Sequence, residues 1–181
     1  MKSPMTVDEL GTVSDSFGVT TVDVVPADWV STHERARDRL GLTFFDWLSV
    51  YDDAEAGLAI VTHLWSIPQR QGVLVRTRVS RDEPTLPTLT GVFRGANWHE
   101  RESFEMFGII FPGHPLLIPL LLPDGFEGHP LRKEFVLASR VAKSWPGAKE
   151  PGESDAEGVP TRRKMAPPGV PDPAEWGEGW R

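Results

Sequence analysis

Histidine and glutamate side chains that could serve as metal ligands or as an acid–base pair lie close together after residue 98. His99 and Glu102 are three positions apart, as are Glu102 and Glu105, so each pair shares a face if the segment is helical. A stand-alone metal-dependent hydrolase using His99, Glu102 and His114 is one hypothesis for such a set. The zinc-protease pattern His-Glu-x-x-His is missing, because position 103 is serine. The incomplete ligand set disfavours metal catalysis.

The charge density of the same segment suggests another role. Glu100, Arg101, Glu102 and Glu105 lie within six residues, and like charges this close raise the free energy unless opposite charges pair with them. Arg101 precedes Glu105 by four positions, which permits an intrahelical ion pair, and a guanidinium can bind two carboxylates at once. We therefore expect a charged network between this helix and a partner, organised by Arg101.

A Gly-His-Pro tripeptide occurs twice, at 113–115 and 128–130, and a phenylalanine precedes each glycine by two residues. Glycine permits an unusual backbone angle, proline fixes its own, and histidine offers a directional polar contact. Cofactor ligation by His114 and His129 is one interpretation, and the preferred one is that both histidines lock turns by hydrogen bonding. Phosphate-binding glycine loops and the nucleophile elbow of serine hydrolases do not occur in the sequence.

The order of these motifs resembles the signature of the 30-kDa-type subunit of proton-pumping NADH:quinone oxidoreductase, respiratory complex I. That family carries E-R-E-x-x-D/E, two aromatic or aliphatic residues and a glycine, then G-H-P, and later E-G-H-P-L-R-K-D/E-F. The matching residues here are 100–108, His114 and 127–135. Leu116-Leu117-Ile118-Pro119 departs from the family, which has an acidic or polar residue, leucine and a basic pair there. We expect this run to make an apolar contact in place of a charged one.

The resemblance implies a cofactor-free structural and assembly subunit in the peripheral arm of a complex that transfers electrons from NADH to quinone. FMN and iron–sulfur clusters are then expected in partner subunits, namely the hydrogenase-large-subunit-like quinone-site subunit and the iron–sulfur subunits. The expected location is the cytoplasmic side of the cell membrane, as a peripheral protein. An equivalent subunit of an energy-converting hydrogenase or a formate-oxidising complex is the alternative. The residues expected at a partner interface are Glu100, Arg101, Glu102, Glu105, Phe107, His114, Ile118, His129, Arg132 and Lys133.

Composition narrows the function classes further. The 181 residues include 19 basic and 26 acidic side chains, a formal charge of −7, which argues against nucleic acid as a partner. Cysteine is absent, so the sequence provides no disulfide, zinc-thiolate site or cysteine-ligated iron–sulfur cluster. No secretory signal is apparent, and the longest aliphatic run, 116–122, is far short of the roughly 20 apolar residues of a membrane-spanning helix. We expect a soluble chain that reaches the membrane only through partners.

The elements that must position the signature follow from hydrophobic periodicity. Residues 20–25, 43–51, 58–65 and 73–79 are typical of strands, and near-helical spacing after Asp28 predicts a helix that ends at Gly41. Two short helical pieces are predicted over 89–93 and 98–107, with Gly108 in the left-handed conformation after the second. The predicted fold class is α+β: a small mixed or antiparallel sheet with helices on one face, followed by an extended C-terminal tail rich in proline and glycine.

Four regions are expected along the chain: an N-terminal segment over 1–19, an α+β core domain over 20–96, an interaction segment carrying the signature over 97–143, and the tail over 144–181. The tail contains seven prolines and six glycines, too many for packed helix or sheet. It also contains Trp145, Trp176 and Trp180, which are unfavourable in water. We expect it to become ordered across partner subunits.

Overall fold

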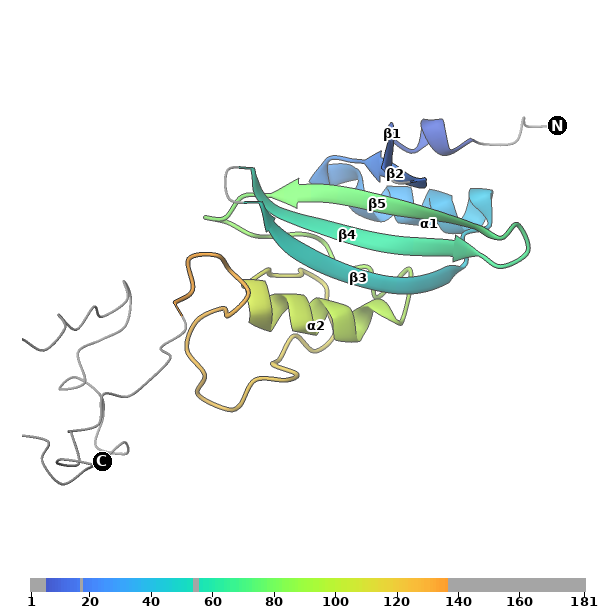
Figure 1. Ribbon diagram of the computed structural model, residues 1–181. Helices are drawn as coiled ribbons and strands as arrows, with labels where there is room; N and C mark the ends of the chain where they lie inside the picture. The colour runs from blue at the N-terminus through green and yellow to red at the C-terminus, as the bar shows by residue number, and fades with distance from the viewer. Residues whose placement is uncertain (1–5, 17, 54–55, 137–181) are drawn as a thin grey trace, which may run out of the picture. The chain divides into compact units, whose positions relative to one another are not determined.

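The computed structural model describes residues 6–16, 18–53 and 56–136 (Figure 1). The predicted tail over 144–181, with its three tryptophans, lies outside these residues. The chain divides into two units, Met1–Lys133 and Glu134–Arg181, and the sheet, the helices and both Gly-His-Pro tripeptides belong to the first.

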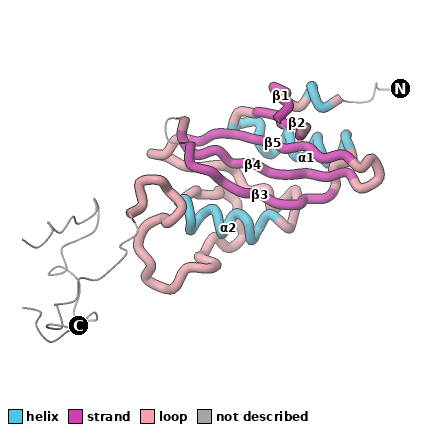
Figure 2. Tube along the Cα trace, in the orientation of Figure 1, coloured by secondary structure: helices cyan, strands magenta, loops and turns pink. Residues whose placement is uncertain are grey.

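A five-stranded mixed sheet forms the centre of this unit (Figures 1 and 2). Its order is β1-β2-β5-β4-β3, with β2 and β5 parallel and all other neighbours antiparallel. The strands are β1 (Thr12–Ser16), β2 (Val19–Asp23), β3 (Phe44–Asp53), β4 (Gly57–Ser66) and β5 (Gln71–Val79). The helices are α1 (Trp29–Leu40) and α2 (Ala96–Phe107), with two short 3-10 turns, η1 (Val7–Glu9) and η2 (Pro26–Asp28). The predicted α+β class is confirmed.

Both helices pack on the same face of the sheet. His33 of α1 hydrogen-bonds to the Thr62 hydroxyl on β4 at 2.7 Å, and His99 of α2 packs edge-on against Phe45 of β3, with 5.6 Å between ring centroids. Phe45 pairs with Leu64, which lies two residues from Thr62 and therefore faces the same way. The helices and this face enclose one apolar core, and α2 lies along β3 at the edge of the sheet (Figure 1).

Helix α1 ends at the predicted residue. Gly41 has a φ of 70°, and its amide bonds to the Ala36 carbonyl, which is the left-handed cap expected of a glycine at this position. The four predicted strands correspond to β2, β3, β4 and β5, with boundaries that differ by a few residues. Burial alternates along β5 as predicted, because its valines face the helices and its arginines face away.

One strand was not predicted, and one predicted helix is wrong. Residues 12–16 form an edge strand, β1, although the N-terminal segment gave no strand signal. Residues 89–93 form a turn, in which the amides of Val92 and Phe93 both bond to the Leu89 carbonyl, and the helix begins only at Ala96. The Leu89 amide is bound by the side chain of Glu100, so a contact distant in sequence fixes this segment.

No helix within the described residues is long and apolar enough to cross a membrane.

Candidate functional site

Helix α2 carries the signature carboxylates, and its buried stripe includes one of them. The stripe runs through Ala96, Glu100, Ser103 and Phe107, which recur at intervals of three and four residues. Glu100 thus occupies a position where an apolar side chain is expected, and it is fully buried. A carboxylate in such a position requires hydrogen-bond partners from the surrounding segments.

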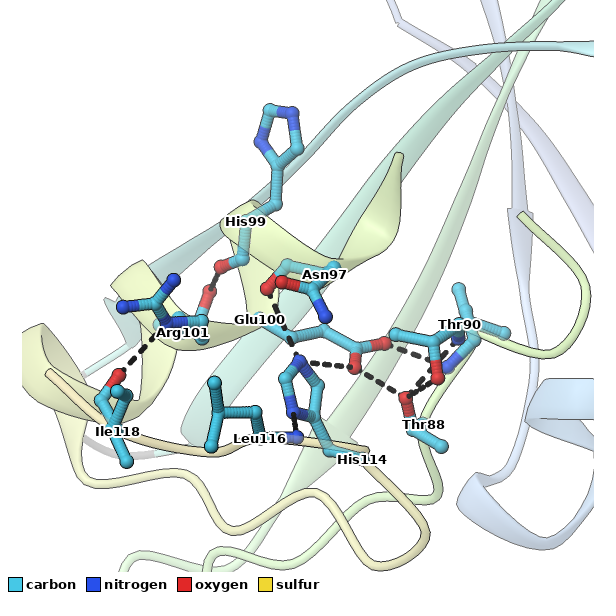
Figure 3. A network of polar contacts seen from close by, with 11 residues as sticks. Thr88, Thr90, Asn97, His99, Glu100, Arg101, His114, Leu116 and Ile118 are labelled. Atoms are coloured by element: carbon cyan, nitrogen blue, oxygen red, sulfur yellow. Dashed lines mark hydrogen bonds and ion pairs between the residues drawn. The ribbon is translucent and has the colours of Figure 1, made fainter. Parts of the chain in front are cut away.

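Two chain segments provide those partners (Figure 3). Glu100 accepts hydrogen bonds from the Thr88 hydroxyl and from the Leu89 amide, the latter at 2.6 Å. Nε2 of His114 lies 3.9 Å from the carboxylate oxygen of Glu100 that accepts the Thr88 hydroxyl proton. Burial raises the pKa of Glu100 from its usual 4.5 to about 7, and the hydrogen bonds from Thr88 and Leu89 act in the opposite direction.

His114 fixes the turn of the first Gly-His-Pro. Its Nδ1 accepts the Leu116 amide proton at 3.1 Å, so Nε2 carries the ring proton and donates it to the Asn97 carbonyl at 3.2 Å. These bonds confirm the predicted turn-locking role of His114. They also attach the turn to the first turn of α2.

Three residues of α2, spaced at intervals of four, bind the chain segment that follows this turn. They hold the segment alongside the helix. Asn97 receives the His114 proton through its carbonyl, and Arg101 donates to the carbonyls of Ile118 and Pro119 at 3.0 and 2.8 Å. Glu105 accepts the amide protons of Leu120, Leu121 and Leu122 at 2.8 to 3.1 Å. The loop over residues 114–122, here called the docking loop, is therefore bound to α2 in a fixed register.

These backbone contacts set the direction of the loop's apolar side chains. Leu117 packs against the core, whereas Leu116, Ile118 and Leu121 are 56%, 46% and 62% exposed. Side chains of α2 bind the carbonyls of Ile118 and Pro119 and the amides of Leu120, Leu121 and Leu122, so the loop has a defined conformation although much of its apolar surface faces water. Exposed leucine and isoleucine side chains grouped on one ordered loop are typical of a contact surface.

The second Gly-His-Pro segment closes the C-terminal end of α2. His129 Nδ1 donates to the Glu105 carbonyl at 2.9 Å, the Leu131 amide to the Met106 carbonyl at 3.2 Å, and Arg132 Nε to the Phe107 carbonyl at 2.6 Å. Consecutive carbonyls that the last helical turn leaves unpaired are thus satisfied. The cation of Arg132 also lies at the negative end of the helix dipole.

Gly108 permits this close approach. Its φ is +74°, and a Cβ at this position would lie 2.5 Å from Nε2 of His129 and 2.9 Å from a guanidinium nitrogen of Arg132. Gly108, which was predicted to end the helix, therefore also leaves room for the side chains of His129 and Arg132, because it has no side chain of its own.

Asp52 on the sheet binds the chain just after the second Gly-His-Pro, at Lys133. This aspartate on β3 is buried, pairs with Arg81, and accepts the Lys133 amide proton at 2.8 Å. The signature segment is consequently attached at both ends, to α2 and to the sheet.

The structure changes the interpretation of several residues predicted at the partner interface. Glu100, Glu105 and Phe107 are buried within the chain, because the first two bind its own loops and Phe107 belongs to the core. Arg101 binds two backbone carbonyls where carboxylates were expected. Glu100, Arg101 and Glu105 thus position loops of this chain, and Phe107 contributes to its core. Direct partner contact by these four residues stays a prediction.

The remaining predicted interface residues reach the surface to different extents. Glu102, Ile118 and Lys133 are exposed, and Arg132 is half-buried. The histidines of the two tripeptides use ring nitrogens on backbone groups. Direct partner contact by the exposed residues stays a prediction.

Sequence reasoning missed Asp52, Thr88 and Asn97. Asp52 and Thr88 act on segments distant in sequence, and neither lies in a motif. Asn97 had a signal, because it precedes Arg101 and Glu105 by four and eight positions and so shares their helix face.

The structure does not bring the hydrolase set together. His99 Nδ1 donates to the Leu48 carbonyl on β3, whereas His114 lies beside Asn97 and Glu102 is exposed. No group of three or more histidine, aspartate or glutamate side chains within the described residues is arranged to hold a metal ion.

Comparison with known proteins identifies relatives of this chain. The model of the family described as respiratory-chain NADH dehydrogenase, 30 Kd subunit, matches residues 22–141. An NADH-quinone oxidoreductase subunit of Mesorhizobium japonicum is 39% identical over 140 residues, which cover 73% of this chain and 69% of that protein. The subunit of the same name from Roseiflexus sp. is 46% identical over 89 residues, and this match spans only 51% of that protein's length and 49% of this chain.

Solved structures share the fold. A trypsin-resistant fragment of Nqo5 superposes with a TM-score of 0.54 at 26% identity, covering 61% of this chain and 92% of the fragment. A chain of the membrane-bound sulfane sulfur reductase, an archaeal respiratory membrane complex, gives a TM-score of 0.59 at 19% identity, covering 79% and 94% of the two chains. The second likeness concerns the fold alone.

Proposed function

The chain belongs to the 30 kDa subunit family of the respiratory-chain NADH dehydrogenase, and from that premise we propose that it is a cofactor-free structural and assembly subunit. The complex it serves is a proton-translocating NADH:quinone oxidoreductase, which transfers electrons from NADH to quinone. FMN and the iron–sulfur clusters lie in other subunits. This chain lies in the peripheral arm, on the cytoplasmic side of the membrane, and is held there by its partners.

The use of the signature side chains supports a structural role. Asn97, Arg101 and Glu105 bind the docking loop, and His129 and Arg132 bind the end of α2. Side chains engaged with backbone groups are poorly placed to ligate a cofactor or to transfer protons to a substrate. The sequence also lacks cysteine, the usual ligand of iron–sulfur clusters.

The exposed apolar side chains of the docking loop carry the proposal. Leu116, Ile118 and Leu121 are ordered by α2 yet open to solvent. Burial of one such side chain at an interface contributes about 1.5–3 kcal/mol. We assign this surface to contact with the hydrogenase-large-subunit-like protein of the quinone site, and neighbouring iron–sulfur subunits complete the environment of the chain.

A pair of isoleucine variants tests the assignment. Ile118→Asp places a charge on the docking loop, and Ile67→Asp places the same charge on the β4–β5 turn, where the isoleucine is 64% exposed. Both variants keep the thermal melting temperature of the isolated chain. In a complex purified through a tag on another subunit, Ile118→Asp is depleted and Ile67→Asp is retained at the wild-type level. Wild-type retention of Ile118→Asp refutes a docking role for this loop.

The alternative is an equivalent subunit in a membrane-bound hydrogenase or formate-oxidising complex. The likeness to a sulfane sulfur reductase chain is compatible with it at the level of the fold. Relatives named as NADH-quinone oxidoreductase subunits, at 39% and 46% identity, favour complex I. Mass spectrometry of co-purified proteins separates the two: a flavoprotein that oxidises NADH supports complex I, and a nickel-binding large subunit supports the alternative.

A further inference from the structure

Three carboxylates are buried in the described part of the chain, and each is stabilised differently. Asp52 pairs with the guanidinium of Arg81. Glu105 accepts three loop amides, a strong arrangement for a negative charge. Glu100, the most deeply buried, is bound by a hydroxyl and one amide, with only the imidazole of His114 nearby. A buried carboxylate without a cation at hydrogen-bond distance favours its neutral form.

Few groups around Glu100 could stabilise the negative charge of its ionised form. The segment before α2 contributes Thr88 and the Leu89 amide, both neutral, and the first Gly-His-Pro turn contributes His114. Among the described neighbours that contact the carboxylate, His114 is the one titratable group. Its Nδ1 accepts the Leu116 amide proton, a bond that requires the neutral imidazole. His114 thus offers Glu100 a neutral N–H at 3.9 Å and no full positive charge.

We propose that Glu100 is a buried proton-binding site that exchanges one proton with solvent in the folded chain, and that reversal of the Thr88 and Thr90 hydroxyls accommodates the exchange. This inference is independent of the proposed docking role.

The hydroxyl pair satisfies both states of the carboxyl group (Figure 3). Thr88 Oγ1 lies 2.9 Å from Thr90 Oγ1 and accepts the Thr90 amide proton at 3.1 Å. When Glu100 is ionised, the Thr88 hydroxyl donates to it and the Thr90 hydroxyl donates to Thr88. When Glu100 is protonated, its O–H donates to Thr88, and the Thr88 hydroxyl donates to Thr90. The Leu89 amide stays on the other carboxyl oxygen throughout.

The sign of the pH dependence follows from the pKa of Glu100, which burial raises to about 7 in the folded chain from a usual 4.5. As pH rises above 4.5, the unfolded chain releases a proton that the folded chain retains, so stability falls until about pH 7. Glu100 alone should therefore raise the unfolding equilibrium constant by about tenfold per pH unit within this window.

His33 opposes this effect in the wild-type chain. Burial lowers its pKa from 6.5 to about 4, against the hydrogen bond to the Trp29 carbonyl, so stability falls as pH drops through that range. The two slopes have opposite signs between about pH 4.5 and 6.5 and conceal each other. A comparison with Glu100→Gln removes the contribution of His33, which is common to both proteins.

The test measures urea unfolding of the full chain and of Glu100→Gln, an uncharged mimic of protonated Glu100, from pH 5 to 8. The ratio of the wild-type to the variant unfolding constant should rise about 40-fold between pH 5 and 7, and only about twofold more by pH 8. A constant ratio, or one that falls, overturns the proposal. A second measurement needs no variant: carbon-13 NMR follows the chemical shift of the Glu100 carboxyl carbon in the wild type as pH changes. A titration midpoint near 7 supports the site, and a midpoint near 4.5 refutes it.

Thr88→Val tests the hydroxyl pair separately. The substitution removes a hydrogen bond from both forms of Glu100, and the charge-assisted bond to the ionised form is the stronger of the two, so the NMR midpoint of Glu100 should shift upward. An unchanged or lowered midpoint contradicts the relay.

Discussion

Substitution of Gly108 by alanine should destabilise the chain far more than the same change at another glycine of equal backbone conformation. Gly108 and Gly125 have φ of +74° and +79°, so alanine is strained by a similar amount at both. A Cβ at Gly108 would meet His129 at 2.5 Å, whereas one at Gly125 has nothing within 4 Å. The pair therefore separates backbone strain from loss of the helix-capping contacts.

The expected magnitudes follow from the contacts. Left-handed backbone strain in alanine contributes roughly 1–2 kcal/mol at each position. At Gly108 the imidazole and the guanidinium must also leave the end of α2. The bond from His129 to the Glu105 carbonyl is then lost, as is the bond from Arg132 to the Phe107 carbonyl. These bonds contribute about 1 and about 1.5–3 kcal/mol, so Gly108→Ala should lose roughly 3.5–6 kcal/mol in total.

Equilibrium unfolding in urea by circular dichroism measures both variants, with wild type as the reference. The free energy of unfolding should fall about 2.5–4 kcal/mol further for Gly108→Ala than for Gly125→Ala. Equal losses would refute this reasoning, because they would mean that His129 and Arg132 move away from Gly108 without consequence.

Three other outcomes are expected. In Glu105→Gln the side chain cannot accept all three loop amide protons as a carboxylate does. Hydrogen exchange of those amides should therefore accelerate while exchange within the sheet stays unchanged, and unaltered exchange in the loop would contradict the assignment. Asp52→Asn removes the buried carboxylate charge that pairs with Arg81 and should lower the free energy of unfolding by about 1.5–3 kcal/mol, against at most about 1 kcal/mol for Asp53→Asn, whose ion pair is exposed. Similar losses in urea unfolding would show that burial of Asp52 is unimportant. His33→Gln should reduce the loss of stability as pH falls from about 6.5 to about 4, and pH-dependent unfolding curves parallel to wild type would show that His33 accepts a proton in the folded chain.

Hydrophobic periodicity predicted the central elements because their burial is regular. The alternating pattern of β5 and the stop at Gly41 could be read locally, and both are confirmed. Strand β1 (Thr12–Ser16) was missed because it is a polar edge strand whose pairing with β2 provides the conformation. The turn over 89–93 was mistaken for a helix because its decisive contact, from Glu100, comes from a later helix.

The candidate site was predicted in location and only partly in role. The density of charge around Arg101 indicated a network, but ion pairs with a partner were expected. Arg101 and Glu105 instead bind carbonyls and amides of the docking loop. Backbone groups are present in every residue and leave no mark in the sequence, so such partners become visible only in the fold. The apolar run beginning at Leu116 exposes Leu116, Ile118 and Leu121, and contact of this run with a partner stays a prediction.

The most direct test of the docking role is site-specific photo-crosslinking in the assembled complex. A photoreactive amino acid replaces Ile118 in one sample and Ile67 in another, and mass spectrometry identifies the attached peptides. We expect crosslinks from position 118 to the hydrogenase-large-subunit-like protein and none to that protein from position 67. The docking role would be contradicted if position 67 formed crosslinks to that protein and position 118 formed none.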